Sequence, residues 1–162
     1  MPKTLKLFLI GAGILLAVGV VAEGIRGAAP PVRRNFTATD LQGRTFSLAE
    51  HRGKHPVILT FFATWCGPCR MELPEFVELK RRLPEKDIQV VVVATDPAEA
   101  IKADPTLRDL PVTWITDAAD IHRMYRVEAL PHTNVFGANG DQVRELPGYD
   151  PTAIEEIEKL LK

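Results

Sequence analysis

Residues 57–69 read VILTFFATWCGPC, and this stretch decides the fold. Its first part, Val57–Ala63, is apolar nearly throughout and begins with β-branched side chains, which is typical of a strand covered on both faces. The stretch then contains both cysteines of the 162-residue chain, Cys66 and Cys69, and a helical pattern follows to about Leu83. We therefore predict a buried strand that carries a cysteine pair to the start of a helix.

The spacing of the cysteine pair points to thiol–disulfide exchange. Free N–H groups and the dipole at a helix N-terminus favour a thiolate, so a cysteine there has a lowered pKa. We assign Cys66 as the nucleophile and Cys69, one turn inside the helix, as the more buried resolving cysteine. The pair itself is the redox-active group, and no other cofactor is expected. The alternatives are half of a metal site or a permanent staple, although a disulfide that closes so short a loop adds little stability.

Glu72 is the candidate for handling the proton of the resolving thiol. On a helical wheel it falls inside the arc formed by Cys69, Leu73 and Phe76. A carboxyl group on an apolar face is costly to ionise, so its pKa should rise towards the range that suits proton transfer. The alternative is a solvated glutamate at the edge of the apolar stripe, and the helical wheel leaves both interpretations open.

The flanking segments predict an α/β fold. Upstream, strands at Phe36–Leu41 and Arg44–Leu48 flank a Gln42-Gly43 turn and predict a β-hairpin. Downstream, the patterns predict strands at Ile88–Ala94, Val112–Thr116, Thr133–Phe136 and Gln142–Leu146, and helices at Pro97–Ala103, at Ala118–Tyr125 and after Asp150, the last with an apolar stripe of Ile154, Ile157, Leu160 and Leu161. This order is typical of a mixed central sheet with helices on both faces.

Residues 1–26 predict a membrane anchor or a signal sequence. Lys3 and Lys6 precede an apolar run from Leu7 to Ala22, and no acidic residue occurs before Glu23. The length and the flanks favour an uncleaved single-pass anchor, and a cleaved signal peptide is the alternative. In both cases the lysines should stay cytoplasmic and the domain should be exported to a compartment where disulfides persist.

Residues 27–35, with Pro30-Pro31 inside them, predict a linker, and residues 36–162 the folded domain. The composition, 46% hydrophobic and 25% charged, is that of a globular protein. A net charge of −1 and the lack of a basic stripe give no case for a nucleic-acid partner.

The sequence FATWCGPCR at residues 62–70, followed by Glu72, Pro74 and a distant Leu130-Pro131, resembles the thioredoxin superfamily. Within that superfamily it is similar to the membrane-anchored thiol–disulfide proteins of the TlpA/ResA/DsbE branch. The resemblance covers about three-quarters of the chain, from Phe36 to the C-terminus. It implies a thioredoxin-like fold with the predicted hairpin as an N-terminal extension.

The resemblance also implies a substrate-binding wall opposite the cysteines. Leu130-Pro131 would be a cis peptide bond that faces the pair, and the Leu130 backbone would pair with a bound substrate segment. Glu72 matches a glutamate of the branch, which supports its role in proton handling. The substrate-contacting residues expected in this way are Trp65, Gly67, Pro68, Leu130, Pro131 and His132.

Three departures from the family pattern carry information. Thioredoxins have a buried aspartate six residues before the first cysteine, where this chain has Thr60, so Glu72 is the better candidate for proton handling. His132 stands where the branch usually has a small polar residue or glutamate. The segment Arg126–His132 does not match the approach of the DsbE-type cytochrome-maturation proteins, which weakens a dedicated role with apocytochrome c.

The expected function is reduction of disulfides in exported proteins, among them apocytochrome c or copper-site proteins, with electrons from a membrane donor protein. Gly67-Pro68 is the dipeptide of thioredoxin, a reductant, and a disulfide-forming oxidant is the alternative direction.

Two other functions use the same cysteines. A copper chaperone would use Cys66, Cys69 and His132, because thiolate and imidazole suit copper. A peroxidase is excluded, because peroxiredoxins place threonine and proline three and seven residues before the reactive cysteine, where this chain has Ala63 and Leu59.

Overall fold

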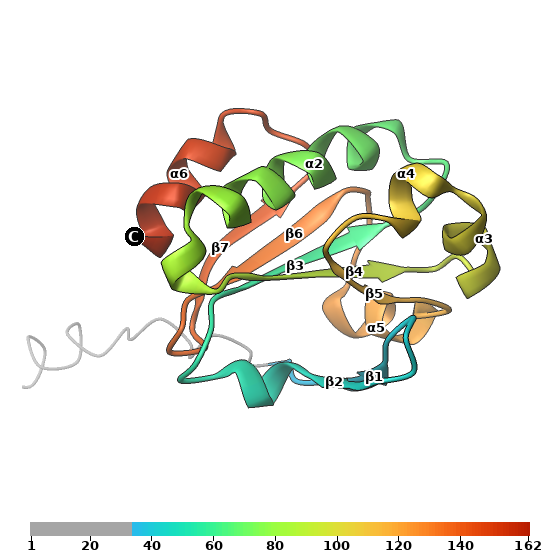
Figure 1. The fold of residues 1–162 in the computed structure, drawn as a ribbon, viewed down its shortest axis with the longest axis horizontal. Helices are drawn as coiled ribbons and strands as arrows, with labels where there is room; N and C mark the ends of the chain where they lie inside the picture. The colour runs from blue at the N-terminus through green and yellow to red at the C-terminus, as the bar shows by residue number, and fades with distance from the viewer. Residues whose placement is uncertain (1–33) are drawn as a thin grey trace, which may run out of the picture. The chain divides into compact units, whose positions relative to one another are not determined.

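The computed structural model describes residues 34–162, in which a five-stranded sheet lies between helices (Figure 1). The predicted anchor or signal sequence, residues 1–26, and residues 27–33 of the predicted linker lie outside the described residues. Within residues 34–162, no helix is both long enough and apolar enough to cross a membrane.

The sheet is mixed, as predicted. Its strands follow the order β5-β4-β3-β6-β7, and their bounds are Val57–Phe62 (β3), Gln89–Ala94 (β4), Thr113–Ile115 (β5), His132–Phe136 (β6) and Gln142–Pro147 (β7). β4 runs parallel to β3 and β5, whereas β6 runs antiparallel to β3 and β7. β3 therefore occupies the centre and is buried at every position, which explains its unbroken apolar sequence.

Helices cover both faces of the sheet. Their bounds are Gly67–Arg82 (α2), Ala98–Ala103 (α3), Pro105–Arg108 (α4), Ala119–Tyr125 (α5) and Ala153–Leu161 (α6), with 3₁₀ turns at Leu48–His51 (η1) and Pro84–Lys86 (η2). Figure 1 shows α2 and α6 on one face and α5 on the other. Side chains alternate along β3, so Ile58 and Phe62 join the core under α2, whereas Leu59 and Phe61 join the core under α5.

The predicted hairpin forms, with shorter strands than expected. β1 (Thr37–Thr39) and β2 (Thr45–Ser47) pair antiparallel as a separate sheet. The Asp40 carboxylate fixes the turn, because it accepts hydrogen bonds from the backbone N–H groups of Gln42 and Arg44 at 3.0 and 2.8 Å.

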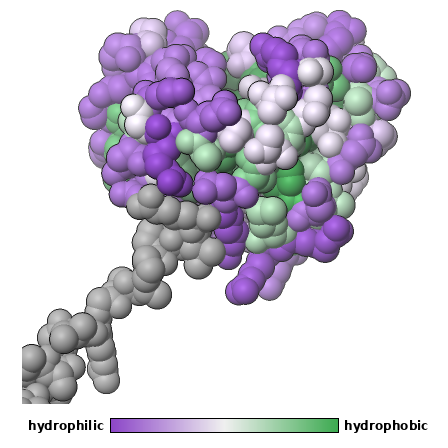
Figure 2. Space-filling view, turned by 90° about the horizontal axis from the view of Figure 1, so that it is seen from below, coloured by the Kyte–Doolittle hydropathy of each residue, from purple (hydrophilic) through white to green (hydrophobic). Residues whose placement is uncertain are grey.

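On the face seen in Figure 2, hydrophilic side chains surround a smaller apolar area.

The last helix differs from the prediction at both its start and its buried face. The helix expected directly after Asp150 begins at Ala153, and the Asp150 carboxylate accepts a hydrogen bond from the Thr152 N–H. The buried positions are therefore Ala153, Ile157 and Leu161, which recur every four residues. Leu160 was predicted in the apolar stripe but is 45% exposed, because it lies on the neighbouring face of the helix.

Candidate active site

The cysteine pair lies where β3 passes into α2. Cys66 is the N-cap of α2, and its Sγ accepts a hydrogen bond from the Cys69 N–H at 3.2 Å. The two cysteines form a disulfide with a Cα–Cα distance of 5.3 Å. Pro68 fits the first turn of the helix because that turn needs no N–H donor from it. The predicted placement of Cys66 at a helix N-terminus, where a thiolate is stabilised, is confirmed.

Both cysteines are buried in the disulfide form. Their exposed fractions are 4% for Cys66 and 2% for Cys69, so the predicted order holds by a small margin. The neighbouring residues are open to solvent: Gly67 and Pro68 are exposed, and Trp65 is 77% exposed. A partner would therefore meet Trp65, Gly67 and Pro68 on its way to the disulfide.

Hydrogen bonds from the β4–α4 region hold the approach to Cys66. Asp96 accepts from the backbone N–H of Thr64 at 3.0 Å and from its hydroxyl at 2.6 Å. Arg70, in the first turns of α2, forms an ion pair with Asp104. The hydrogen bond from Thr106 and that from Arg70 lower the pKa of Asp104 to about 2. These contacts are not evident from the sequence, where Asp96-Pro97 and Asp104-Pro105 signal only helix starts.

Glu72 lies between α2 and the sheet and is 3% exposed. Its Oε2 accepts hydrogen bonds from the Thr60 hydroxyl at 3.1 Å and from the Thr133 hydroxyl at 3.0 Å. Burial raises the pKa of Glu72 to about 7, although both hydrogen bonds oppose this, and the charge of Glu75 adds to the rise. The interpretation of Glu72 as a solvated glutamate is therefore wrong, and the predicted direction of its pKa shift holds.

The Leu130-Pro131 peptide bond is cis, as the family resemblance implied. His132 pairs with Phe61 across β3 and β6, so Pro131 lies at the end of the sheet from which the chain leads to Cys66. Leu130 packs against the core that contains both cysteines. Among residues 34–162, neither the N–H nor the C=O of Leu130 makes a hydrogen bond. The Leu130 backbone is thus free to pair with another chain.

The structure does not bring His132 together with the cysteines. Alternation along β6 turns Thr133 towards α2, so His132 faces the opposite side of the sheet. There its ring lies 6.0 Å from that of Phe61, and its Nε2 is 3.0 Å from Glu145 Oε1. No group of three His, Cys, Asp or Glu side chains in the described part of the chain is arranged to hold a metal ion. The copper set of Cys66, Cys69 and His132 is therefore not assembled.

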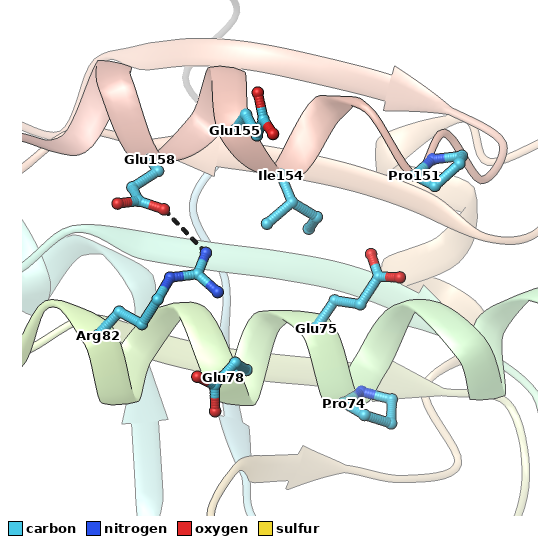
Figure 3. A pocket seen from close by; sticks show the side chains of 8 residues that line it. All are labelled: Pro74, Glu75, Glu78, Arg82, Pro151, Ile154, Glu155 and Glu158. Atoms are coloured by element: carbon cyan, nitrogen blue, oxygen red, sulfur yellow. Dashed lines mark hydrogen bonds and ion pairs between the residues drawn. The ribbon is translucent and has the colours of Figure 1, made fainter.

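A hollow of about 500 Å³ lies between α2 and α6 (Figure 3). An ion pair between Arg82 and Glu158, at 2.8 Å, crosses it. Glu75 also lines it and accepts a hydrogen bond from the Tyr149 hydroxyl at 2.7 Å. No predicted site residue lines this hollow. Its link to the active site is Glu75, whose charge helps to raise the pKa of Glu72.

A mixed sheet with helices on both faces, a Cys-x-x-Cys disulfide at a helix N-terminus and a cis-proline at the same end of the sheet define a thioredoxin-like thiol–disulfide oxidoreductase. The chain belongs to the AhpC/TSA family, whose family model matches residues 28–144. It is similar to the thiol-disulfide oxidoreductase ResA of Bacillus thuringiensis subsp. konkukian (strain 97-27), with 33% identity over 131 residues that cover 79% of this chain and 73% of the relative.

Solved structures show the same fold. One neighbour is a secreted Mycobacterium tuberculosis disulfide oxidoreductase homologous to E. coli DsbE, with 26% identity, a TM-score of 0.62, and coverage of 76% of this chain and 92% of that chain. Another is a thiol:disulfide interchange protein of the thioredoxin family from Chlorobium tepidum TLS, with a TM-score of 0.70 at 23% identity, covering 83% of this chain and 97% of that chain. The predicted thioredoxin-like fold and enzyme class are confirmed.

Replacing Glu72 by glutamine should change how stability depends on pH. The folded-state pKa of about 7 lies above the ordinary value of 4.5, so the folded protein binds this proton more tightly than the unfolded chain does. Between about pH 4.5 and 7, the free energy of unfolding should therefore fall as pH rises, by at most about 3 kcal/mol relative to Glu72→Gln. Urea unfolding of the disulfide form of both proteins across this range measures the difference.

Glu99→Gln, at an exposed position of α3, is the matched control and should follow the wild type. Parallel stability profiles for wild type and Glu72→Gln would show that Glu72 ionises in the folded protein as it does in the unfolded chain.

Proposed function

We propose that this protein reduces disulfide bonds of exported proteins, with Cys66 as the nucleophile, Cys69 as the resolving cysteine and Glu72 as the acceptor of the Cys69 proton. One observation carries the proposal. The disulfide lies at the N-terminus of α2, and a buried carboxyl group with a pKa near neutrality lies one turn further along the same helix. The proposal is supported by this combination, because a helix N-terminus favours a thiolate and a carboxyl group that titrates near neutral pH suits proton transfer.

The first step is attack on the substrate. The reduced protein enters with a Cys66 thiolate, favoured by the free N–H groups of the first turn of α2, including that of Cys69. Its sulfur forms a bond to one sulfur of the substrate disulfide, the substrate S–S bond breaks, and one substrate sulfur leaves as a thiolate that takes a proton from water. The product is a mixed disulfide between Cys66 and the substrate.

The second step resolves the mixed disulfide. The Cys69 thiol passes its proton to the Glu72 carboxylate, and the Cys69 thiolate attacks the sulfur of Cys66. The mixed disulfide breaks, the second substrate sulfur leaves as a thiolate and is protonated, and Cys66 and Cys69 are left oxidised. A carboxyl group whose pKa is about 7 suits this transfer, because it is partly ionised at neutral pH and can also release the proton again.

Substrate recognition rests on backbone pairing beside the disulfide. The free N–H and C=O groups of Leu130 offer an edge to an extended substrate segment. The exposed Trp65, Gly67 and Pro68 form the opposite rim. His132 takes no part in this rim, since its side chain lies on the other face of the sheet.

Reduction is the direction that the active-site dipeptide favours. Gly67-Pro68 is also the dipeptide of thioredoxin, whose reduction potential is about −270 mV, against about −120 mV for the oxidant DsbA. A protein that reduces exported disulfides needs its own disulfide reduced in turn. We assign that role to a dithiol of a membrane protein that carries electrons out of the cytoplasm.

Export is supported by residues 1–26, whose apolar run follows Lys3 and Lys6. It is also supported by the similarity to a secreted disulfide oxidoreductase of Mycobacterium tuberculosis. Location matters to the mechanism, because a compartment without the cytoplasmic thiol pool is where substrate disulfides persist.

Cys69→Ala should trap substrates. Without the resolving thiol, the mixed disulfide on Cys66 cannot be broken from within the protein, so covalent complexes should accumulate in cells of the source organism. Non-reducing electrophoresis detects them, and a reductant should release them. Cys66→Ala/Cys69→Ala is the matched control and should form none. The mechanism fails if the Cys69→Ala protein keeps a reactive Cys66 thiol and yet traps nothing.

The reduction potential of the Cys66–Cys69 pair should lie nearer to the thioredoxin value of about −270 mV than to the DsbA value of about −120 mV. Equilibration of the full chain with dithiothreitol buffers of graded ratio, followed by thiol alkylation, gives the potential. A value close to that of DsbA would make the protein an oxidant and reverse the proposed direction.

In intact cells, the active-site thiols should react with a membrane-impermeant maleimide after treatment with an impermeant reductant. The two cysteines are the sole thiols of the chain, so no other residue contributes to the signal. Deletion of residues 1–26 should abolish labelling in intact cells but not in lysates. Labelling of the full chain solely after lysis would contradict export.

A further inference from the structure

Two buried threonines from different strands meet the carboxyl group of Glu72. Thr60 of β3 and Thr133 of β6 lie directly opposite one another in the antiparallel register. Both side chains face α2, and they are 3% and 0% exposed. The Thr133 hydroxyl is 2.9 Å from the Thr60 hydroxyl, so the two hydroxyl groups and Glu72 Oε2 form a closed triangle.

The contacts of Glu72 are one-sided. Both hydrogen bonds end on Oε2, and Oε1 accepts none from any residue in the described range 34–162. One carboxyl oxygen is thus anchored to the sheet, while the other makes no hydrogen bond to the residues that the structure describes. Cys69 lies one turn before Glu72 on the same helix, and a proton bound at the unanchored oxygen would leave the anchor in place.

Hydroxyl groups suit a carboxyl group that changes protonation state. Each hydroxyl is both a donor and an acceptor and turns about its C–O bond. Thr60 and Thr133 can both donate to Oε2 of the ionised carboxylate, and they can go on donating to Oε2 as the carbonyl oxygen when the proton is on Oε1. These hydrogen bonds are stronger to the charged carboxylate than to the neutral acid, so they lower the pKa of Glu72 against the effect of burial.

We propose that Thr60 and Thr133 are positioning residues that hold the Glu72 carboxyl group by one oxygen in both of its protonation states and leave the other oxygen free for proton transfer. The inference deepens the function proposed above, and its relevance to catalysis rests on Glu72 accepting the Cys69 proton. The effect of the two threonine hydroxyls on the carboxyl group can be measured without any exchange reaction.

Few other charges act on this carboxyl group among the described residues. On α2, Glu75 raises the pKa of Glu72, and the cysteine pair lies one turn before it. In the loop before α6, the Tyr149 hydroxyl is bonded to Glu75, and the charge of Glu72 helps to raise the pKa of Tyr149. β3 and β6 contribute the two neutral hydroxyl groups. Loss of those hydroxyls therefore removes the interactions that favour the ionised form, with nothing to replace them.

The test compares two double variants of the full chain. Thr60→Val/Thr133→Val keeps the side-chain volume and removes both hydroxyls, whereas Thr60→Ser/Thr133→Ser removes the methyl groups and keeps the hydroxyls. In each protein the ¹³C chemical shift of the Glu72 carboxyl carbon is followed against pH, with the signal assigned by its loss in Glu72→Gln. The valine variant should raise the titration midpoint by about one pH unit, a tenfold change in proton affinity, and the serine variant should stay near the wild type.

Equal midpoints in the valine and serine variants would overturn the proposal. If the double valine variant does not fold, the single variants Thr60→Val and Thr133→Val, each with its serine counterpart, make the same comparison with smaller upward shifts. The pH profile for resolution of a Cys66 mixed disulfide separates the two proposals. A midpoint that moves in the valine variant while the rate profile does not supports the positioning role and removes Glu72 from the exchange mechanism.

Discussion

The junction of β3 and α2 is the constraint on which the rest of the site depends. β3 is central in the sheet and buried at every position, so its last residues have one path out of the core, towards Cys66 at the N-cap of α2. The helix that follows must pack its apolar face back onto the same sheet. That packing presses Glu72 against the strands, and the proximity of disulfide and carboxyl group is therefore a consequence of how strand and helix join.

This arrangement has a cost in stability. A carboxyl group held at 3% exposure is disfavoured in its charged form, and the rise of its pKa to about 7 expresses that penalty. The hydrogen bonds from Thr60 and Thr133 limit the penalty without removing it. A carboxyl group that is partly ionised at neutral pH is useful in exchange chemistry, whereas an exposed one would stay ionised and a fully unpaired one would stay neutral.

The sequence was sufficient for the features that depend on local patterns. The run Val57–Phe62, the helix start at Cys66 and the hairpin turn at Gly43 follow from periodicity and turn chemistry, whereas the helical wheel left the burial of Glu72 open. The sequence was insufficient where the position of a side chain depends on the register between strands that are distant in the chain. Thr60 and Thr133 are far apart in the chain, and a shift of one residue in β6 would have exchanged Thr133 with its neighbour on the α2 face. His132, predicted as a substrate contact and, in the alternative function, as a copper ligand beside the cysteines, lies on the other face for the same reason.

The register also gives a physical reason for Thr60. Thioredoxins have a buried aspartate at this position, and here the Thr60 hydroxyl is 3.1 Å from the Glu72 carboxylate. A second carboxylate at that distance would be like-charged, and at least one of the two would be forced to stay protonated. A hydroxyl group instead donates to the carboxylate and carries no charge. The threonine on the strand and the glutamate on the helix therefore form one unit, in which the helix carries the titrating group and the strand supplies an uncharged hydrogen-bond donor to it.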